Sequence, residues 1–129
     1  MGLNQLRDEV HHNAVEHGWW EEERSFGEII ALCHSELSEA LEEYREEGLK
    51  IYFKCEKDHD CGLYEYGGVN KECTGCTRNK PEGIAIELAD CIIRILDYCG
   101  KEDIDIEKAI KIKHEYNKTR PYRHGGKKI

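Results

Sequence analysis

Two short acidic motifs of the same form occur in the sequence, and together they could bind a divalent cation. The first contains Glu36 and Glu39, and the second contains Glu87 and Asp90. Residues three positions apart lie on the same face of a helix, one turn from each other. Carboxylate oxygens are hard ligands that suit Mg²⁺ and also Mn²⁺. Two helices that present these pairs to each other would therefore enclose a cation site.

The second motif is the more specific one because its surroundings are apolar. Between residues 84 and 99 nearly every position is apolar except Glu87, Asp90, Arg94 and Asp97. On a helix these four residues fall within an arc of about 80°. A charged group in an apolar core costs several kcal/mol unless it is paired or binds a metal. The alternative interpretation is a pair of ordinary solvated acidic faces.

Three residues near the C-terminal end form a candidate phosphate-binding face. Lys113, Asn117 and Arg120 follow one another at positions i, i+4 and i+7. Lysine and arginine neutralise phosphate oxygens, and asparagine donates a further hydrogen bond. A basic helix end is also favoured by the helix dipole alone, so the pattern has a purely structural interpretation as well.

Aromatic residues near the N-terminus are candidates for contact with a nucleobase. Trp19 and Trp20 follow directly after a predicted helix end, and His12 lies within that helix. An indole stacks well on a flat base, although aromatic side chains more often belong to a core. The sequence does not decide which of these side chains points inward.

The seven cysteines divide into two groups. Three stand singly in apolar periodic segments and are expected to be small buried hydrophobic residues: Cys33, Cys91 and Cys99. The other four lie close together and are candidate zinc ligands: Cys55, Cys61, Cys73 and Cys76. The last two have the spacing of a zinc knuckle, and His59 is an alternative ligand. The segment has few core-forming residues, so a structural Zn²⁺ would supply folding free energy that it otherwise lacks. Unligated thiols and a redox role are the alternatives.

Composition excludes several classes of function. The 129 residues include 19 Lys and Arg against 27 Asp and Glu, which gives a formal net charge of -8. An acidic chain does not suit a nucleic-acid polymer or an anionic membrane as its main partner. No apolar run is long enough to span a membrane, and the polar N-terminus does not resemble a signal peptide. An odd number of cysteines also argues against a disulfide framework. We therefore expect a cytoplasmic protein.

Hydrophobic periodicity predicts two helices in the first part of the chain. The first covers residues 3 to about 17 and ends at Gly18. The second begins after Ser25, which has Glu28 three positions later in a capping-box pattern. Its apolar stripe continues to Gly48.

Two further helices are predicted after a Cys-rich stretch over residues 49–80, in which helical periodicity disappears. Pro81 suits the first turn of a third helix that runs to Cys99, with Gly100 as its stop. Asp103 or Asp105 caps a fourth helix. These elements predict one all-α domain over residues 1–129, a four-helix-type bundle with an irregular insert. The third helix is apolar nearly all round, which predicts a homo-oligomer.

The order of these motifs resembles the MazG-like nucleoside triphosphate pyrophosphohydrolases of the all-α superfamily. The resemblance rests on Glu36-Leu-Ser-Glu39 and Glu87-Leu-Ala-Asp90, on Gly18-Trp19-Trp20 before them, and on the segment from Lys113 to Arg120 after them. It implies hydrolysis of a (d)NTP to the (d)NMP and pyrophosphate, often as housecleaning of the nucleotide pool. It also implies Mg²⁺ bound by the four carboxylates, phosphates contacted by Lys113, Asn117 and Arg120, and a homodimer or homotetramer. The Cys-rich insert departs from the usual family pattern.

The expected chemistry is an attack by water on the α-phosphorus. Glu36 or Glu39 would orient the water, while Lys113 and Arg120 would stabilise charge on the leaving group. One rival hypothesis is a non-enzymatic helical module whose zinc loop binds a partner protein. Another is a di-iron enzyme, which would need Glu-x-x-His on two helices, whereas only Glu9 with His12 has this spacing on a predicted helix.

Overall fold

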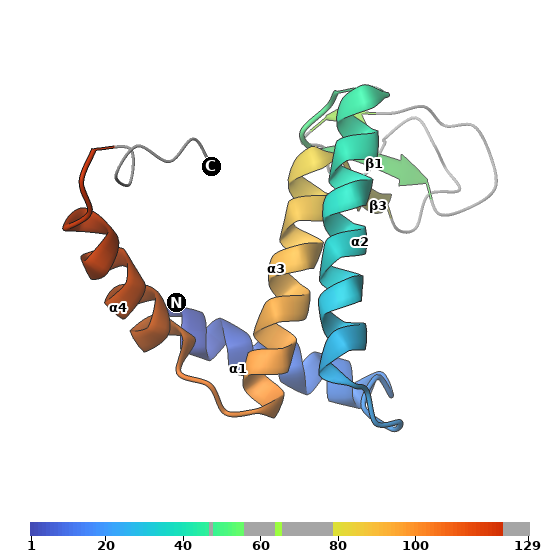
Figure 1. Ribbon diagram of the computed structural model, residues 1–129. Helices are drawn as coiled ribbons and strands as arrows, with labels where there is room; N and C mark the ends of the chain where they lie inside the picture. Colours follow the sequence, from blue (N-terminus) through green and yellow to red (C-terminus); the bar gives the residue numbers. More distant parts are fainter. Residues whose placement is uncertain (47, 56–63, 66–78, 123–129) are drawn as a thin grey trace. The chain divides into compact units, whose positions relative to one another are not determined.

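A computed structural model describes residues 1–46, 48–55, 64–65 and 79–122 (Figure 1). The elements in chain order are α1 (Leu3–Glu16), α2 (Phe26–Arg45), β1 (Tyr52–Cys55), β2 (Tyr64–Glu65), β3 (Asn79–Glu82), α3 (Ile84–Lys101) and α4 (Ile106–Lys118). The predominance of helix agrees with the predicted all-α class, whereas the MazG-like bundle stays a prediction. No helix in this described part of the chain has the length and apolar character needed to cross a membrane.

The chain divides into two compact units. The first unit combines residues 1–22 with residues 96–129, and the second unit consists of residues 23–95. The boundary falls within α3, so the two ends of this helix contribute to different units. The predicted carboxylate motifs both belong to the second unit, whereas the predicted phosphate-binding and base-binding residues belong to the first.

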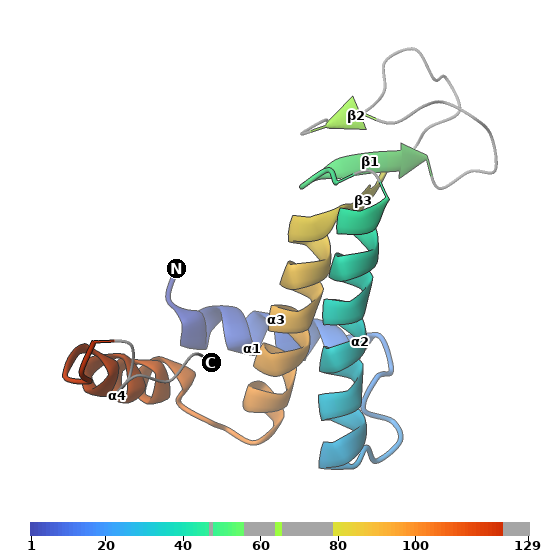
Figure 2. The ribbon, with the colours of Figure 1, turned by 45° about the horizontal axis from the view of Figure 1, so that its top comes forward.

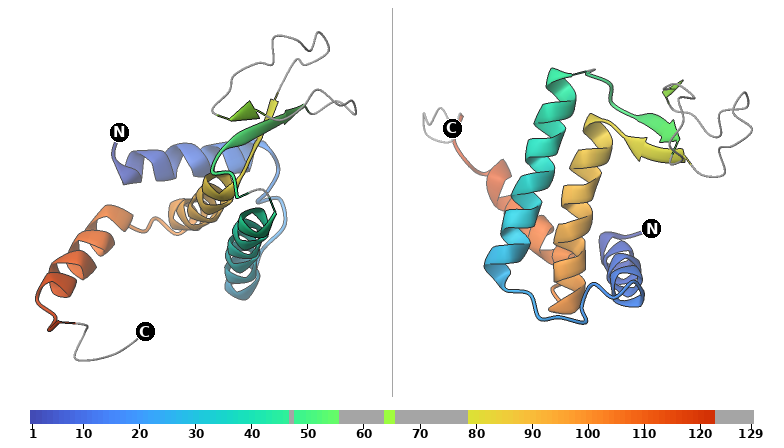
Figure 3. Two further views of the ribbon diagram at one scale, coloured as in Figure 1. Left: turned by 90° about the horizontal axis from the view of Figure 1, so that it is seen from above. Right: turned by 90° about the vertical axis from the view of Figure 1, so that its right-hand side faces the viewer.

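The second unit is built on α2 and the first part of α3, which lie side by side and run in opposite directions (Figures 1 and 3). Ser25 caps α2 as predicted, because its Oγ accepts a hydrogen bond of 3.1 Å from the Glu28 backbone N–H. Three α2 residues and one α3 residue form the buried apolar layer of this unit: Ile29, Cys33, Ala40 and Cys91. The two cysteines are buried here, and Cys99 is buried in the first unit, as the sequence predicted.

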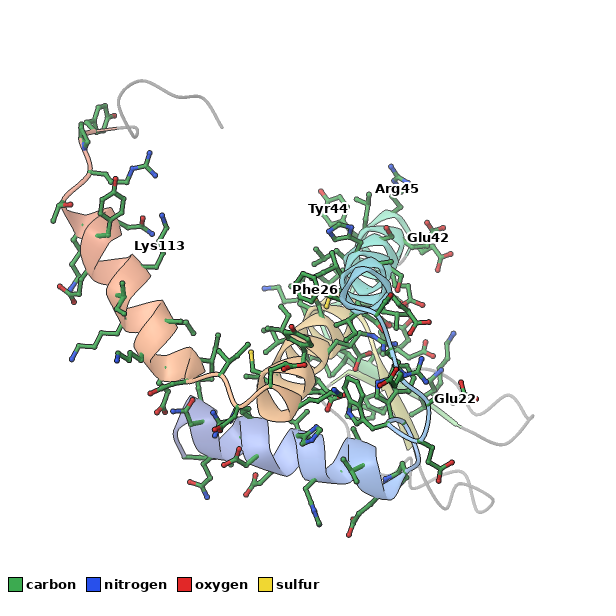
Figure 4. The ribbon with its side chains drawn as sticks, turned by 60° about the horizontal axis from the view of Figure 1, so that its bottom comes forward. Glu22, Phe26, Glu42, Tyr44, Arg45 and Lys113 are labelled. Atoms are coloured by element: carbon green, nitrogen blue, oxygen red, sulfur yellow. The ribbon has the colours of Figure 1, made fainter. Side chains whose placement is uncertain are left out.

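A second apolar face of α2 is exposed. It consists of Phe26, Ile30, Leu37, Leu41 and Tyr44, which are between 38% and 69% exposed. In Figure 4, which looks nearly along α2, the labelled Phe26 and Tyr44 lie on one side of the helix and Glu42 lies on the other. We call these five residues the exposed α2 stripe. A helix of a monomeric protein usually exposes polar residues on the face opposite its core.

Strands β1, β2 and β3 form a small antiparallel sheet in the order β2-β1-β3 (Figure 2). The prediction of an irregular segment over residues 49–80 was therefore wrong for the described strands. Pro81 lies in β3 rather than in the first turn of a helix, and α3 begins at Ile84. A proline is tolerated there because β3 is an edge strand. Gly83 makes the turn into α3 with a φ of 117°, and a Cβ on it would lie 2.5 Å from the Lys50 carbonyl oxygen.

In the first unit, α1 packs with α4 and with the end of α3. Asp105 caps α4 through a 3.0 Å hydrogen bond from the Lys108 N–H, which confirms one of the two predicted caps. Gly100 does not end α3 as predicted, because the helix continues to Lys101. A Cβ on Gly100 would lie 2.5 Å from the His11 Cβ, so glycine allows the close approach of α1 and α3. The left-handed residue after α3 is Asp103, with a φ of 52°.

Candidate metal centre

The two predicted carboxylate motifs meet between α2 and α3. One carboxylate oxygen from each of Glu36, Glu39 and Glu87 lies within 4.8 Å of the others. The helical spacing directs Glu36 and Glu39 to one face of α2, and the antiparallel arrangement brings Glu87 of α3 to that face. Glu36 is buried at 7% exposure, Glu87 is half-buried, and Glu39 is exposed to solvent. The three carboxylates therefore form a cluster that is closed on one side and open on the other.

Asp90 lies beside this cluster without joining the group of three. Its negative charge raises the pKa of Glu39 and of Glu87, so its carboxyl is near both. Burial, and then the charge of Glu36, raise the pKa of Asp90 itself, while the Arg94 and Lys80 charges oppose that rise. Asp90, the fourth predicted ligand, is thus close enough to interact electrostatically with the other three carboxyls.

Arg94 partly neutralises the cluster. Its Nε donates a 2.8 Å hydrogen bond to a carboxylate oxygen of Glu36. Burial raises the pKa of Glu36, but hydrogen bonds from Glu39 and Arg94 outweigh burial and hold the pKa below its usual value. In the sequence, Arg94 lies on the same helix face as Glu87 and Asp90. Its ion pair with Glu36 explains why a positive charge occurs on this face.

The other carboxyls of the cluster have raised pKa values. A hydrogen bond to Glu36 and burial raise the pKa of Glu39. Burial, followed by the charges of Glu39 and Asp90, raises the pKa of Glu87 to about 7. The ionised forms of these carboxyls are therefore disfavoured, and a nearby cation would favour them.

At one end of the site, a tyrosine that no sequence pattern indicated links α2 to the segment before α3. Tyr52 of β1 is 2% exposed, and its hydroxyl lies 2.8 Å from a Glu43 oxygen and 3.1 Å from a Glu82 oxygen. Burial, and then these two acceptors, raise the pKa of Tyr52. Glu43 lies one turn after Glu39, and Glu82 immediately precedes the turn into α3. The hydroxyl therefore ties the end of α2 to the start of α3.

The predicted phosphate-binding residues lie at the end of α4, in the first unit. Lys113 and Asn117 are exposed, and Arg120 is half-buried. Lys113 Nζ lies 5.0 Å from the centre of the Tyr116 ring, and the Arg120 guanidinium lies 6.0 Å from it. The Tyr116 ring thus lies near two of the three predicted residues, Lys113 and Arg120. Their contact with a phosphate stays a prediction.

The candidate base-binding residues have different surroundings. Trp20 is half-buried, and its Nε1–H donates a 2.9 Å hydrogen bond to Asp97. His11 Nδ1 lies 2.8 Å from the same Asp97 oxygen. His12 is exposed and lies 3.0 Å from a Glu16 oxygen. His12 was the predicted residue, whereas the structure brings His11 to Asp97. The signal in the sequence for this contact was Asp97, because a charged residue on an otherwise apolar helix needs a polar partner when it is buried.

The remaining predicted residues carry less structural information. Trp19 is half-buried after α1. Cys55 lies in β1, where its backbone pairs with Asn79. The other three candidate zinc ligands, Cys61, Cys73 and Cys76, lie outside the described residues, as does the alternative ligand His59. Comparisons of the chain with protein-family models, with curated proteins and with solved structures found no match.

Proposed function

We propose that the protein is a Mg²⁺-dependent nucleoside triphosphate pyrophosphohydrolase, which cleaves a (d)NTP to the (d)NMP and pyrophosphate. The observation that carries the proposal is the convergence of Glu36, Glu39 and Glu87 oxygens within 4.8 Å of one another. The MazG-like resemblance of the sequence supplies the reaction. Such an enzyme would meet its substrate in the cytoplasm and would remove unwanted nucleotides from the pool.

The carboxylate cluster fits a hard divalent cation. Its donors are all oxygens, which Mg²⁺ and Mn²⁺ prefer. Arg94 pairs with Glu36, while hydrogen bonding, burial and neighbouring carboxylates disfavour the ionised forms of Glu39, Glu87 and Asp90, which a bound cation would favour. A di-iron site would require histidine ligands, and the described cluster contains none.

The roles of the residues follow from their positions. Bound Mg²⁺ would neutralise the triphosphate and polarise the α-phosphoryl group. Glu39 is the exposed member of the cluster, so it can accept a proton from a water that approaches from solvent. Glu36 is buried and held by Arg94, which suits a fixed ligand better than a mobile base. The water attacks in line, and the bond to the pyrophosphate oxygen breaks.

The remaining contacts of the proposed enzyme are those that the resemblance implies. In this proposal Lys113, Asn117 and Arg120 bind phosphate oxygens and stabilise the leaving pyrophosphate. Trp19, Trp20 or His12 would contact the base. The Trp20 N–H is already hydrogen-bonded to Asp97, and Lys101 Nζ lies 5.2 Å from the centre of the Trp20 ring, so a base would stack on the other ring face or displace Lys101.

The test is a panel of canonical and damaged nucleoside triphosphates assayed with Mg²⁺ for both products. Release of the monophosphate with pyrophosphate, rather than the diphosphate with phosphate, identifies cleavage between the α and β phosphorus atoms. Glu39→Gln and Asp90→Asn are expected to abolish turnover while leaving the fold intact. Glu42→Gln is the matched control, because Glu42 is an exposed carboxylate of α2 that does not belong to the group of three.

Three outcomes would contradict the proposal. Full activity in both Glu39→Gln and Asp90→Asn would show that the cluster does not carry the reaction. A wild-type protein that turns over no triphosphate, and that Mg²⁺ with a dNTP does not stabilise, would favour the non-enzymatic interaction module. Bound iron with its characteristic absorbance would favour the di-iron alternative.

The proposed enzyme is a homodimer or homotetramer. The exposed α2 stripe supports this part of the proposal, and α3 adds exposed apolar residues of the same unit, Leu88, Ile92 and Ile95. A second copy with the same stripe would cover these side chains in a self-complementary, two-fold interface. Light scattering after size exclusion measures the assembly directly.

We also propose a structural Zn²⁺ in the Cys-rich insert, with Cys55, Cys61, Cys73 and Cys76 as ligands. The support is the Cys-x-x-Cys spacing of the last pair and the scarcity of core-forming residues around it. Elemental analysis of protein purified without chelator is expected to give about one equivalent of zinc. Less than about a tenth of an equivalent would contradict the assignment.

A further inference from the structure

A single buried hydroxyl group joins α2 to the strand that leads into α3. Tyr52 of β1 is 2% exposed, and its hydroxyl lies 2.8 Å from a Glu43 oxygen and 3.1 Å from a Glu82 oxygen. A hydroxyl has one proton and donates it to one acceptor at a time. Glu82 also pairs with Lys54 at 3.2 Å and with Lys80 at 3.3 Å, so Glu43 is the acceptor that gains more from the hydroxyl.

The backbone carries this contact from Tyr52 to the start of α3. Tyr52 and Glu82 are partners in the register of β1 and β3, and Gly83 alone separates Glu82 from α3. The first two backbone N–H groups of α3 donate hydrogen bonds of 3.0 Å and 2.9 Å to the carbonyl groups of residues 49 and 50, just before β1. The start of α3 is therefore fixed to β1, and Tyr52 is the residue through which β1 also holds α2.

The carboxylate cluster lies between this contact and a second one. On α2, Glu43 is one turn beyond Glu39, the exposed member of the cluster. One turn before Glu39 is Glu36, whose carboxylate accepts a 2.8 Å hydrogen bond from Arg94 Nε of α3. All of these residues belong to the second unit. Two polar links thus hold α2 and α3 together on either side of the clustered carboxylates.

The cluster needs such links because its members repel one another. Oxygens of Glu36, Glu39 and Glu87 lie within 4.8 Å of one another, a distance at which carboxylates push the two helices apart. Mg²⁺ holds its ligands at about 2.1 Å, so two oxygens that share the ion lie at most about 4 Å apart. A small widening between the helices would therefore prevent Glu39 and Glu87 from sharing a cation.

We propose that Tyr52 is a positioning residue for the cation site, because its hydroxyl holds the end of α2 against the start of α3 and so keeps Glu39 within reach of Glu87. The inference rests on the Mg²⁺ site of the proposed function and is independent of the substrate. Tyr52 itself does not touch the cation. Its position in β1 gives the strand at the beginning of the Cys-rich insert a role in the site.

The expected effect is a loss of Mg²⁺ affinity in a protein that stays folded. Without the hydroxyl, the folded chain divides between an arrangement with the helix ends together and one with them apart. Only the first arrangement binds the ion, so the apparent affinity falls by the fraction of molecules that occupy it. A hydrogen bond to a carboxylate is strong enough to change such an equilibrium about tenfold.

The experiment is calorimetric titration of the full chain with Mg²⁺ alone. Tyr52→Phe keeps the ring and the net charge, and it is expected to weaken Mg²⁺ binding about tenfold. Gly100→Ala is the control for a general loss of stability, because its added methyl group would meet His11 within the first unit. This control is expected to bind Mg²⁺ like the wild type. Circular dichroism confirms that each variant is folded.

Glu43→Ala tests whether Tyr52 acts through Glu43. In the Glu43→Ala background the hydroxyl has lost its nearer acceptor, so adding Tyr52→Phe is expected to weaken Mg²⁺ binding much less than in the wild type. The loss of the Glu43 charge is common to both members of this second comparison and cancels. An equal effect of Tyr52→Phe in the two backgrounds would overturn the proposed link between Tyr52 and Glu43.

Two results of the titration would overturn the inference outright. If the hydroxyl only stabilises the fold, Tyr52→Phe will unfold at a lower urea concentration but bind Mg²⁺ like the wild type. Absence of Mg²⁺ binding by the wild type would overturn it as well, because there would be no cation site to position.

A turnover assay separates this inference from the proposed function. Turnover of triphosphates by the wild type, with unchanged Mg²⁺ affinity in Tyr52→Phe, would leave the function standing and reject the positioning role. Weaker Mg²⁺ binding by Tyr52→Phe, in a protein that turns over no triphosphate, would do the reverse. If both hold, excess Mg²⁺ is expected to restore the kcat of Tyr52→Phe.

Discussion

Glu87→Gln tests the electrostatics of the carboxylate cluster most directly. Burial, and then the charges of Glu39 and Asp90, raise the pKa of Glu87 from 4.5 to about 7. Between these two values the folded state keeps a proton that the unfolded chain has released. The stability contributed by Glu87 is therefore full below pH 4.5 and is lost as the pH rises through about 7. Glutamine has no charge to lose, so the variant escapes this penalty.

The size of the effect follows from the shift. A rise from 4.5 to about 7 corresponds to at most about 3 kcal/mol at pH 8. Glu87 is only half-buried and shares its charge with its neighbours, so about 1–2 kcal/mol is the realistic expectation. The amide group that replaces the Glu87 carboxyl in the variant can donate to Glu36, as a protonated Glu87 would. The variant is therefore expected to be more stable than the wild type at pH 8, and the difference is expected to shrink toward pH 5.

The assay is urea unfolding at pH 5 and at pH 8, first with chelator and then with Mg²⁺. In the wild type, Mg²⁺ is expected to raise the free energy of unfolding at pH 8 and to have little effect at pH 5, where a proton occupies the cluster. In Glu87→Gln the Mg²⁺ effect is expected to be much smaller at both pH values. Glu42→Gln on an exposed part of α2 is the control and should follow the wild type.

One result would refute the reasoning. If Glu87→Gln is no more stable than the wild type at pH 8 with chelator, the carboxyls of the cluster do not repel one another as their positions require. The cluster would then be the solvated acidic face that the sequence analysis kept as an alternative.

Three further predictions concern the scaffold. Tyr52→Phe removes the hydroxyl that contacts both Glu43 and Glu82, and it is expected to lower the free energy of unfolding by about 1–3 kcal/mol in urea titrations. An unchanged free energy of unfolding would show that these hydrogen bonds do not stabilise the fold. Gly100→Ala places a methyl group against His11 and is expected to cost about 1–3 kcal/mol in the same assay, whereas Gly27→Ala, which meets nothing within 4 Å, should not clash. Leu41→Lys in the exposed α2 stripe is expected to yield monomers by light scattering, and an intact oligomer would place the interface elsewhere.

Local sequence patterns predicted the helices well because helix formation depends on neighbouring residues. Ser25 caps α2 as predicted, and Asp105, one of the two predicted alternatives, caps α4. The strands were missed because each has two to four described residues, too few for an alternating pattern to stand out. The helix start predicted at Pro81 was wrong because proline suits the first turn of a helix and an edge strand equally.

The candidate site was predictable only in part, for a similar reason. The spacing within each carboxylate motif is a local property, so it directed both pairs to helix faces. The meeting of the two motifs depends on how α2 and α3 pair, so helical spacing suggested a shared cation site without specifying the pairing. The contact of Tyr52 with Glu82 depends on the register of β1 and β3, which no local pattern predicts.

Arg94 offsets only part of the negative charge of the carboxylate cluster. Its charge acts to lower the pKa of Glu36, Glu39 and Asp90, but only the pKa of Glu36 falls. Hydrogen bonding, burial and neighbouring carboxylates outweigh Arg94 at Glu39 and Asp90, and burial with neighbouring carboxylates raises the pKa of Glu87. The fold therefore keeps three carboxyls close together at a cost in stability that protonation or a divalent cation would remove. Protons and Mg²⁺ should compete for the same oxygens, so the affinity for Mg²⁺ should rise as the pH passes through about 7, the pKa of Glu87.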